Sequence, residues 1–165
     1  MQPSIVACAQ AMIAYTGNRV HLTQHFMKVY SFAAAIGAAE GLEPAEQEIL
    51  ELAALVHDIG IIVCMEKYGS AKGELQEEEG PPLARMLLEG LDCEEDKISR
   101  VCWLVGHHHT TSDVTWILHR ILLEADFLVN AFEGKADAER IAQTRRDVFA
   151  TATGLAMLDS MYPVS

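Results

Sequence analysis

The chain has 165 residues, half of them hydrophobic, which is enough for one buried core and short for two domains. The formal net charge of −12 argues against attraction to a nucleic acid polymer or an anionic membrane, because lysine and arginine provide that attraction. No apolar run approaches the roughly 18 residues of a transmembrane helix. We therefore expect a single domain over residues 1–165 that is soluble and cytoplasmic.

Two helices are predicted at the beginning of the chain, over residues 3–15 and 19–40, where apolar residues recur at helical spacing. In the second helix, His25 lies on the apolar face. Lys28 follows within one turn on the same side. We take Lys28 as a candidate substrate-binding residue that could meet a phosphate, and a solvated surface lysine is the alternative.

The third helix ends in the pair His57 and Asp58, which is followed by Gly60. Leu52 and Val56 belong to the apolar face that leads into the pair, so both polar side chains lie at the end of a core-facing helix. An ionised aspartate there is costly unless a positive group meets it. The pattern predicts a salt bridge or a metal ion beside Asp58, and Gly60 suits a left-handed helix cap.

Residues 61–78 mix apolar, basic, glycine and acidic residues, which predicts a long loop that could act as a lid or binding element. Lys72 in this loop is a candidate for contact with an anionic substrate. Glu79 is a candidate general acid or base, although a run of acids before a helix is more often solvated. Pro81 and Pro82 predict the start of the next helix.

Three consecutive histidines, His107, His108 and His109, follow a helix predicted over residues 93–106. One interpretation is a helix C-terminus that favours cations. We favour an active-site role, with His108 in catalysis and with His107 and His109 in substrate binding.

The most apolar helix is predicted over residues 114–132, and a last helix is predicted over residues 138–161. Strand-like alternation is almost absent, so the expected fold is all-α, with about six or seven helices. A shared cation would satisfy all the buried polar groups of the three apolar helices at once. The predicted metal ligands are His25, His57, Asp58 and Asp126.

The order of these ligands resembles the HD domain of metal-dependent phosphohydrolases. The segments around His25, over residues 53–60 and over residues 124–126 match the contexts of that family, and the resemblance spans about residues 18–132. It implies a compact HD-like helical bundle that hydrolyses a phosphomonoester or a phosphodiester, in a nucleotide-like substrate. Asp58 would then also steer the attacking water. One branch of the family has a Glu within one turn after the pair, where this chain has residues 59–61, and another has a Lys at the position of Ile61, so the identity of the substrate stays open.

The expected cofactor is a divalent metal ion, and mixed imidazole and carboxylate ligation suits Mn, Fe, Co, Ni, Zn or Mg. The branch of the family that holds two metals has a further histidine after the pair, whereas this chain has none from Ile59 to Val105. We therefore expect one ion, with two as the alternative. The expected partner is a small phosphorylated or nucleotide-like molecule, and a homo-oligomer is compatible with the sequence. A non-catalytic sensor that binds metal and nucleotide is the alternative function.

Overall fold

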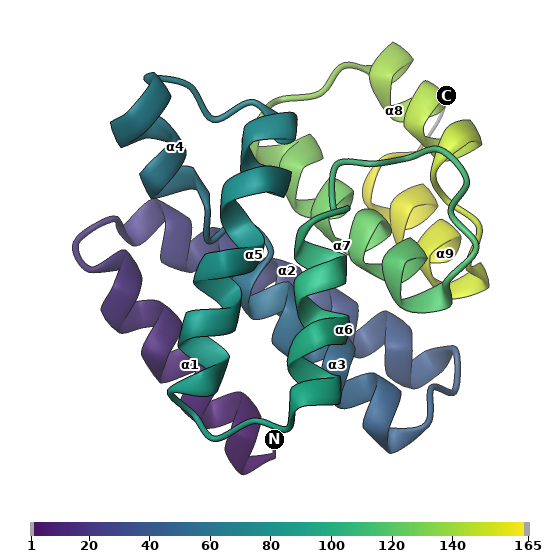
Figure 1. Ribbon diagram of the computed structural model, residues 1–165. Helices are drawn as coiled ribbons and strands as arrows, with labels where there is room; N and C mark the ends of the chain where they lie inside the picture. The colour runs from purple at the N-terminus through teal and green to yellow at the C-terminus, as the bar shows by residue number, and fades with distance from the viewer. Residues whose placement is uncertain (1, 164–165) are drawn as a thin grey trace.

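The fold is all-α. The computed structural model describes residues 2–163, and within them the chain forms nine helices and no strand (Figure 1). The expected all-α class is confirmed, whereas the expected number of six or seven helices is too low. The helices are α1 (Pro3–Thr16), α2 (Val20–Ala39), α3 (Pro44–Val56), α4 (Ile61–Tyr68), α5 (Gly73–Glu89), α6 (Glu95–Val105), α7 (Ile117–Glu133), α8 (Ala138–Asp147) and α9 (Ala152–Met161).

Helix α3 is the central helix of the molecule. It contacts α1, α2, α6 and α7, and residues 49–60 are all buried apart from the half-buried Glu51. A helix that is apolar on all sides is stable only when other elements surround it. Its C-terminal end therefore lies inside the protein, and His57 is the residue that caps it.

Helix α7 is the second largely buried helix. It packs along α2 and also contacts α3, so these three helices meet one another in pairs. Its buried face is almost entirely apolar, with Glu124 and Asp126 as the acidic exceptions. The two acids are two residues apart and point to different sides, because successive residues of a helix are rotated by about 100°. Asp126 faces the cluster described below, whereas Glu124 faces the C-terminal helices.

The segment over residues 61–78 is helical, which corrects the prediction of a long loop. It contains α4 and the beginning of α5, joined by residues 69–72. The left-handed helix cap expected at Gly60 lies instead at Gly69, where φ is 64°. Gly60 has φ −71° and serves a different purpose, since a Cβ atom there would lie 3.1 Å from the backbone nitrogen of Gly80. Because neither Gly60 nor Gly80 has a Cβ atom, α5 can approach the end of α3 closely.

The two prolines expected to open a helix lie in the middle of α5. Each removes a backbone hydrogen bond from the helix interior, at a usual cost of ~3 kcal/mol or more. Packing against α6 offsets this cost, because α5 and α6 lie side by side (Figure 1). Gly106 leaves room for the Pro81 ring, and the Cys102 thiol donates a hydrogen bond to the Pro81 carbonyl at 3.4 Å. Tertiary packing therefore overrides the local signal for a helix start.

The C-terminal helix expected over residues 138–161 is broken into α8 and α9. The break is stabilised by the buried carboxylate of Glu124, which accepts backbone N–H groups from Ala150 at 2.7 Å and Thr151 at 2.9 Å. The Thr151 hydroxyl then caps α9 by accepting the N–H of Gly154 at 2.9 Å. These contacts come from a helix some 27 residues earlier in the chain, so helical periodicity alone does not predict them.

No helix among residues 2–163 is both long enough and apolar enough to span a lipid bilayer.

Candidate metal centre

The four predicted ligands meet at one point in the centre of the molecule. The Nε2 atoms of His25 and His57 lie 3.2 Å apart. Asp58 Oδ2 lies 3.3 Å from the first nitrogen and 3.5 Å from the second, and Asp126 Oδ1 lies 3.3 and 3.4 Å from the same two atoms. All four residues are buried. Helices α2 and α7 and the C-terminal end of α3 thus bring together two nitrogens and two oxygens.

The hydrogen bonds of the two Nδ1 atoms decide the tautomer of each imidazole, and therefore whether its Nε2 atom offers a lone pair to the cluster. His25 Nδ1 lies 2.8 Å from Glu133 Oε2, and His57 Nδ1 lies 2.8 Å from the Ala54 carbonyl oxygen. Both partners are acceptors, so both Nδ1 atoms carry the hydrogen and a neutral ring directs its Nε2 lone pair into the cluster. Two nitrogen lone pairs and two carboxylate oxygens face one another, an arrangement that only a cation or added protons can stabilise.

The pKa values of the cluster show the same demand for positive charge. Burial acts to lower the pKa of His25, but hydrogen bonds to Asp126 and Asp58 outweigh it and raise that pKa to about 11. Burial acts to raise the pKa of Asp126, but hydrogen bonds from His25 and His57 hold it below its usual range. The pKa of Asp58 is also lowered, because the charges and hydrogen bonds of the surrounding histidines overcome its burial. A bound metal ion would replace these protons.

The geometry fits a divalent ion. Bonds of about 2.0–2.2 Å from one ion to nitrogen and oxygen ligands place neighbouring ligand atoms roughly 3.0–3.5 Å apart. The two nitrogens lie 3.2 Å apart, and each lies 3.3–3.5 Å from the nearest oxygen of Asp58 and of Asp126. His25, His57 and Asp58 form a buried group able to hold a metal ion.

Comparison with known families identifies this arrangement. The model of the HD domain matches residues 22–149, which is most of the chain and includes all four residues of the cluster. The chain belongs to the HD domain family. This family is part of a superfamily of metal-dependent phosphohydrolases. No curated protein and no solved structure matches the chain.

This chain has a second group of residues that could hold a metal, formed by Asp58 with His108 and His109. Asp58 Oδ1 lies 2.9 Å from His108 Nε2 and 4.0 Å from His109 Nε2. His108 Nδ1 donates to the Val105 carbonyl at 2.6 Å, so a neutral His108 ring also directs its Nε2 lone pair towards Asp58. Asp58 therefore has one oxygen towards each group, as a carboxylate shared by two ions would require.

The pKa values of His108 and His109 are shifted in opposite directions. Burial acts to lower the pKa of His108, but its hydrogen bond to Asp58 outweighs burial and raises that pKa. Burial and the neighbouring His108 together lower the pKa of His109. The neutral form is therefore favoured more in His109 than in His108, and a general base must be neutral before it can take up a proton.

His107, the first residue of the histidine run, points in another direction. Its ring stacks on Trp103 with 3.9 Å between the ring centroids, and its Nδ1 donates to the Trp103 carbonyl at 2.7 Å. Its own carbonyl accepts a hydrogen bond from His119 Nε2 at 2.7 Å. His107 fixes the turn that carries His108, and no contact joins it to Asp58 within the described residues. Its substrate-binding role stays a prediction.

Lys28 is connected to the cluster through a residue that sequence reasoning did not single out. Lys28 Nζ donates to Glu133 Oε1 at 2.8 Å, and Glu133 Oε2 accepts from His25 Nδ1 at 2.8 Å. Burial acts to raise the pKa of Glu133, but these two hydrogen bonds outweigh it and lower the pKa. The spacing could have revealed Glu133, since it lies two helical turns after Asp126 on α7. Contact of Lys28 with substrate stays a prediction.

The structure does not bring Glu79 and Lys72 to the cluster. The Glu79 carboxylate accepts hydrogen bonds from Lys67 at 2.8 Å and from the Tyr68 hydroxyl at 2.7 Å, which attaches α5 to the end of α4. Lys72 is exposed at the N-cap of α5. Their proposed roles, in acid–base chemistry for Glu79 and in substrate binding for Lys72, stay predictions.

A different part of α5 reaches the histidine turn. Glu77 Oε1 accepts the backbone N–H of His109 at 3.0 Å and the Thr110 hydroxyl at 2.9 Å. Gly73 touches the His109 ring so closely that a Cβ atom there would lie 2.8 Å from it. Gln76, which lies between Gly73 and Glu77 in the sequence, is 5% exposed. Its Oε1 atom has no hydrogen-bond partner within the described residues. The first turns of α5 therefore fix the position of His109.

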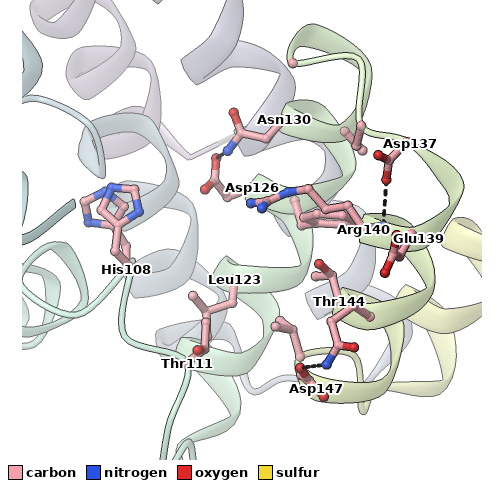
Figure 2. Close-up of a pocket in the computed structure, with 17 residues that line it drawn as sticks. His108, Thr111, Leu123, Asp126, Asn130, Asp137, Glu139, Arg140, Thr144 and Asp147 are labelled. Atoms are coloured by element: carbon pink, nitrogen blue, oxygen red, sulfur yellow. Dashed lines mark hydrogen bonds between the residues drawn. The ribbon is translucent and has the colours of Figure 1, made fainter. Parts of the chain in front are cut away.

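A pocket of about 830 Å³ opens beside the cluster (Figure 2). His108, His109 and Asp126 line one side of it, and α8 lines the other. Pockets for small molecules usually measure about 300–1,000 Å³, so this volume suits a ligand of nucleotide size. The remaining lining residues include Leu123, Phe127, Asn130, Ala131, Arg140, Gln143, Thr144, Asp147 and Val148. The sequence predicted none of these as site residues, because the apolar residues of α7 follow the spacing of a core helix and α8 lies outside the segments that resemble the HD family.

Proposed function

We propose that this HD domain is a metal-dependent hydrolase that cleaves a phosphomonoester or phosphodiester bond in a nucleotide-like substrate. One observation carries the proposal. Three buried helix segments direct two imidazole nitrogens and two carboxylate oxygens to a common point, and Asp126, one of these four residues, also lines a pocket of substrate size. Family membership supports the same reaction class.

The protein residues would hold the ion and the substrate in place. His25, His57, Asp58 and Asp126 would be the ligands, and Glu133 and the Ala54 carbonyl hold the two rings in the correct tautomer. A divalent ion in this position supplies the charge that polarises a phosphoryl oxygen and lowers the pKa of a water molecule towards neutrality. Asp58 would orient the attacking water, and His108 Nε2 lies 2.9 Å from its Oδ1 atom.

The pocket supports a substrate with both an anionic and an apolar part. Leu123, Phe127 and Val148 provide apolar surface, and Thr144 and Asn130 provide hydrogen-bonding groups. A nucleotide-like molecule has this combination of a phosphate, polar hydroxyl groups and a flat ring. The mixed nitrogen and oxygen ligands suit Mn, Fe, Co, Ni, Zn or Mg.

The test combines metal analysis with a phosphoester screen. Purified protein is analysed for bound metals, and protein loaded with Mn, Co, Ni or Mg is then incubated with phosphomonoesters and phosphodiesters. We expect release of phosphate or nucleotide by the wild type and no release by Asp58→Ala. Asp96→Ala is the matched control, because Asp96 is exposed on α6 and far in sequence from every ligand.

Equal activity of wild type and Asp58→Ala would refute the proposal. Tight nucleotide binding without turnover would favour a sensor.

A further inference from the structure

Arg140 is placed in the pocket on the side opposite the metal centre. It belongs to the first turn of α8, and its side chain extends across the pocket towards Asp126 and Asn130 (Figure 2). Among the described residues it is the one lysine or arginine that lines this pocket. Its guanidinium therefore provides the fixed positive charge of the pocket wall.

The Arg140 side chain is exposed, and no partner in the described part of the chain holds its guanidinium. The other two arginines of α8 have partners, since Arg145 pairs with Asp159 at 2.7 Å and Arg146 donates to Gln143 at 2.7 Å. No hydrogen bond or ion pair of the Arg140 side chain occurs within residues 2–163. Its backbone N–H is used to cap the helix by donating to Asp137 at 2.8 Å.

The position of Arg140 in its helix is also unfavourable for a cation. The first turn of a helix is the positive end of its dipole, where acidic residues are stabilising and basic residues are not. An exposed arginine without a partner among the described residues, placed in the first turn and directed into a pocket, goes against this preference. Exceptions of this kind are expected at binding sites, where an anionic ligand supplies the missing charge.

We propose that Arg140 binds the anionic group of the substrate, across the pocket from the His–Asp cluster. This proposal rests on the proposed function and adds a residue that determines substrate specificity. The planar guanidinium can donate two parallel hydrogen bonds to two oxygens of a phosphate. A phosphoryl group between Arg140 and a metal ion held by the His–Asp cluster would thus be bound from both sides.

The charges around Arg140 restrict the kind of anion that fits. The pocket lining has one arginine and four carboxylates, those of Asp126, Asp137, Glu139 and Asp147. One arginine and the metal ion can balance a single phosphoryl group, whereas the further phosphates of a polyphosphate would approach the three outer carboxylates. The geometry therefore points to a substrate with one phosphoryl group and an otherwise uncharged body.

Isothermal titration calorimetry of inorganic phosphate into Mn-loaded protein tests the role of Arg140 independently of turnover. We expect Arg140→Gln to weaken phosphate binding by about tenfold to a hundredfold, as expected for the loss of a charge-assisted hydrogen-bonding group. Arg140→Lys keeps the charge without the planar fork and should give an intermediate value. Lys135→Asn is the matched control, because it also removes one positive charge near the pocket but from a residue outside its lining.

The outcomes separate this proposal from the proposed function. Phosphate binding that is equally tight in wild type and Arg140→Gln, or undetectable in the wild type at millimolar concentration, overturns the role of Arg140. Arg140-dependent phosphate binding by a protein that hydrolyses no phosphoester supports Arg140 and refutes the hydrolase. If the protein is active, Arg140→Gln should raise KM for a monophosphate more than it lowers kcat, and an equal metal content in all variants shows that the centre is intact.

Discussion

Glu133 Oε2 lies 2.8 Å from His25 Nδ1, so the last residue of α7 controls a ring that α2 provides. Removing such a hydrogen-bonding partner from a metal ligand usually costs about 10–100-fold in metal affinity. We expect Glu133→Gln to weaken Mn binding within this range, measured by competition with a chelating dye. Lys28→Met removes the other partner of Glu133 and leaves the bond to His25, so its effect should be smaller. Equal affinity of Glu133→Gln and wild type would contradict this role.

The metal-free protein should lose stability as the pH rises above neutrality. Folding raises the pKa of His25 from 6.5 to about 11, so its stabilising contribution is complete below pH 6.5 and decreases as the pH rises towards 11. The pKa of Asp126 is lowered from 3.8, so its contribution is lost only as the pH falls below 3.8 and does not affect this window. Thermal unfolding of chelator-treated protein should therefore show a lower Tm at about pH 9 than at pH 6.5.

Two controls belong to this experiment. His25→Gln removes the titrating ring, so the same comparison should give a smaller difference in Tm. Metal affinity should change in the opposite direction and increase with pH, because the metal ion displaces the proton from His25. A Tm of the metal-free wild type that does not vary between these two pH values would contradict the assignment.

The number of bound ions should depend on His108 and not on His107. His108 Nε2 lies 2.9 Å from Asp58 Oδ1, whereas the His107 ring stacks on Trp103. If the second group is occupied, His108→Ala should reduce the metal content from two ions per chain to one and leave His25 and His57 with their ion. His107→Ala should keep the content of the wild type. Elemental analysis after equilibrium dialysis measures both, and identical content in wild type and His108→Ala would indicate a single ion.

The break between α8 and α9 should be a major contributor to stability. Glu124 is fully buried and accepts two backbone N–H groups and the Thr151 hydroxyl. Glu124→Gln keeps one oxygen for the two backbone N–H groups but replaces the other by a donor, so the buried Thr151 hydroxyl loses its acceptor, at a cost of about 1–3 kcal/mol in the free energy of unfolding. Urea denaturation measures this loss. The control is Glu74→Gln, an exposed position where a change within about 0.5 kcal/mol is expected. Equal loss in both variants would contradict the role of Glu124.

Local patterns predicted the helical class and placed the four candidate ligands on faces that the structure buries, and they failed where distant residues decide local structure. Residues 61–78 contain glycines and a run of acids, which resemble a loop locally, yet the packing of α5 on α6 holds this region in helices. The prolines at 81 and 82 lie inside a helix for the same reason. The break at residues 148–151 depends on Glu124, which is some 27 residues away.

The sequence by itself determined which helices are buried and which polar side chains they carry into the core. His25, the pair at 57 and 58, and Asp126 lie on faces that must be covered, because exposing so many apolar residues to water is unfavourable. Only the tertiary structure decided which partners these residues meet. Glu133 is 108 residues from His25, and Arg140 of α8 lines the same pocket as Asp126 of α7. Such contacts depend on how helices pack against one another, which the periodicity of a single helix does not specify.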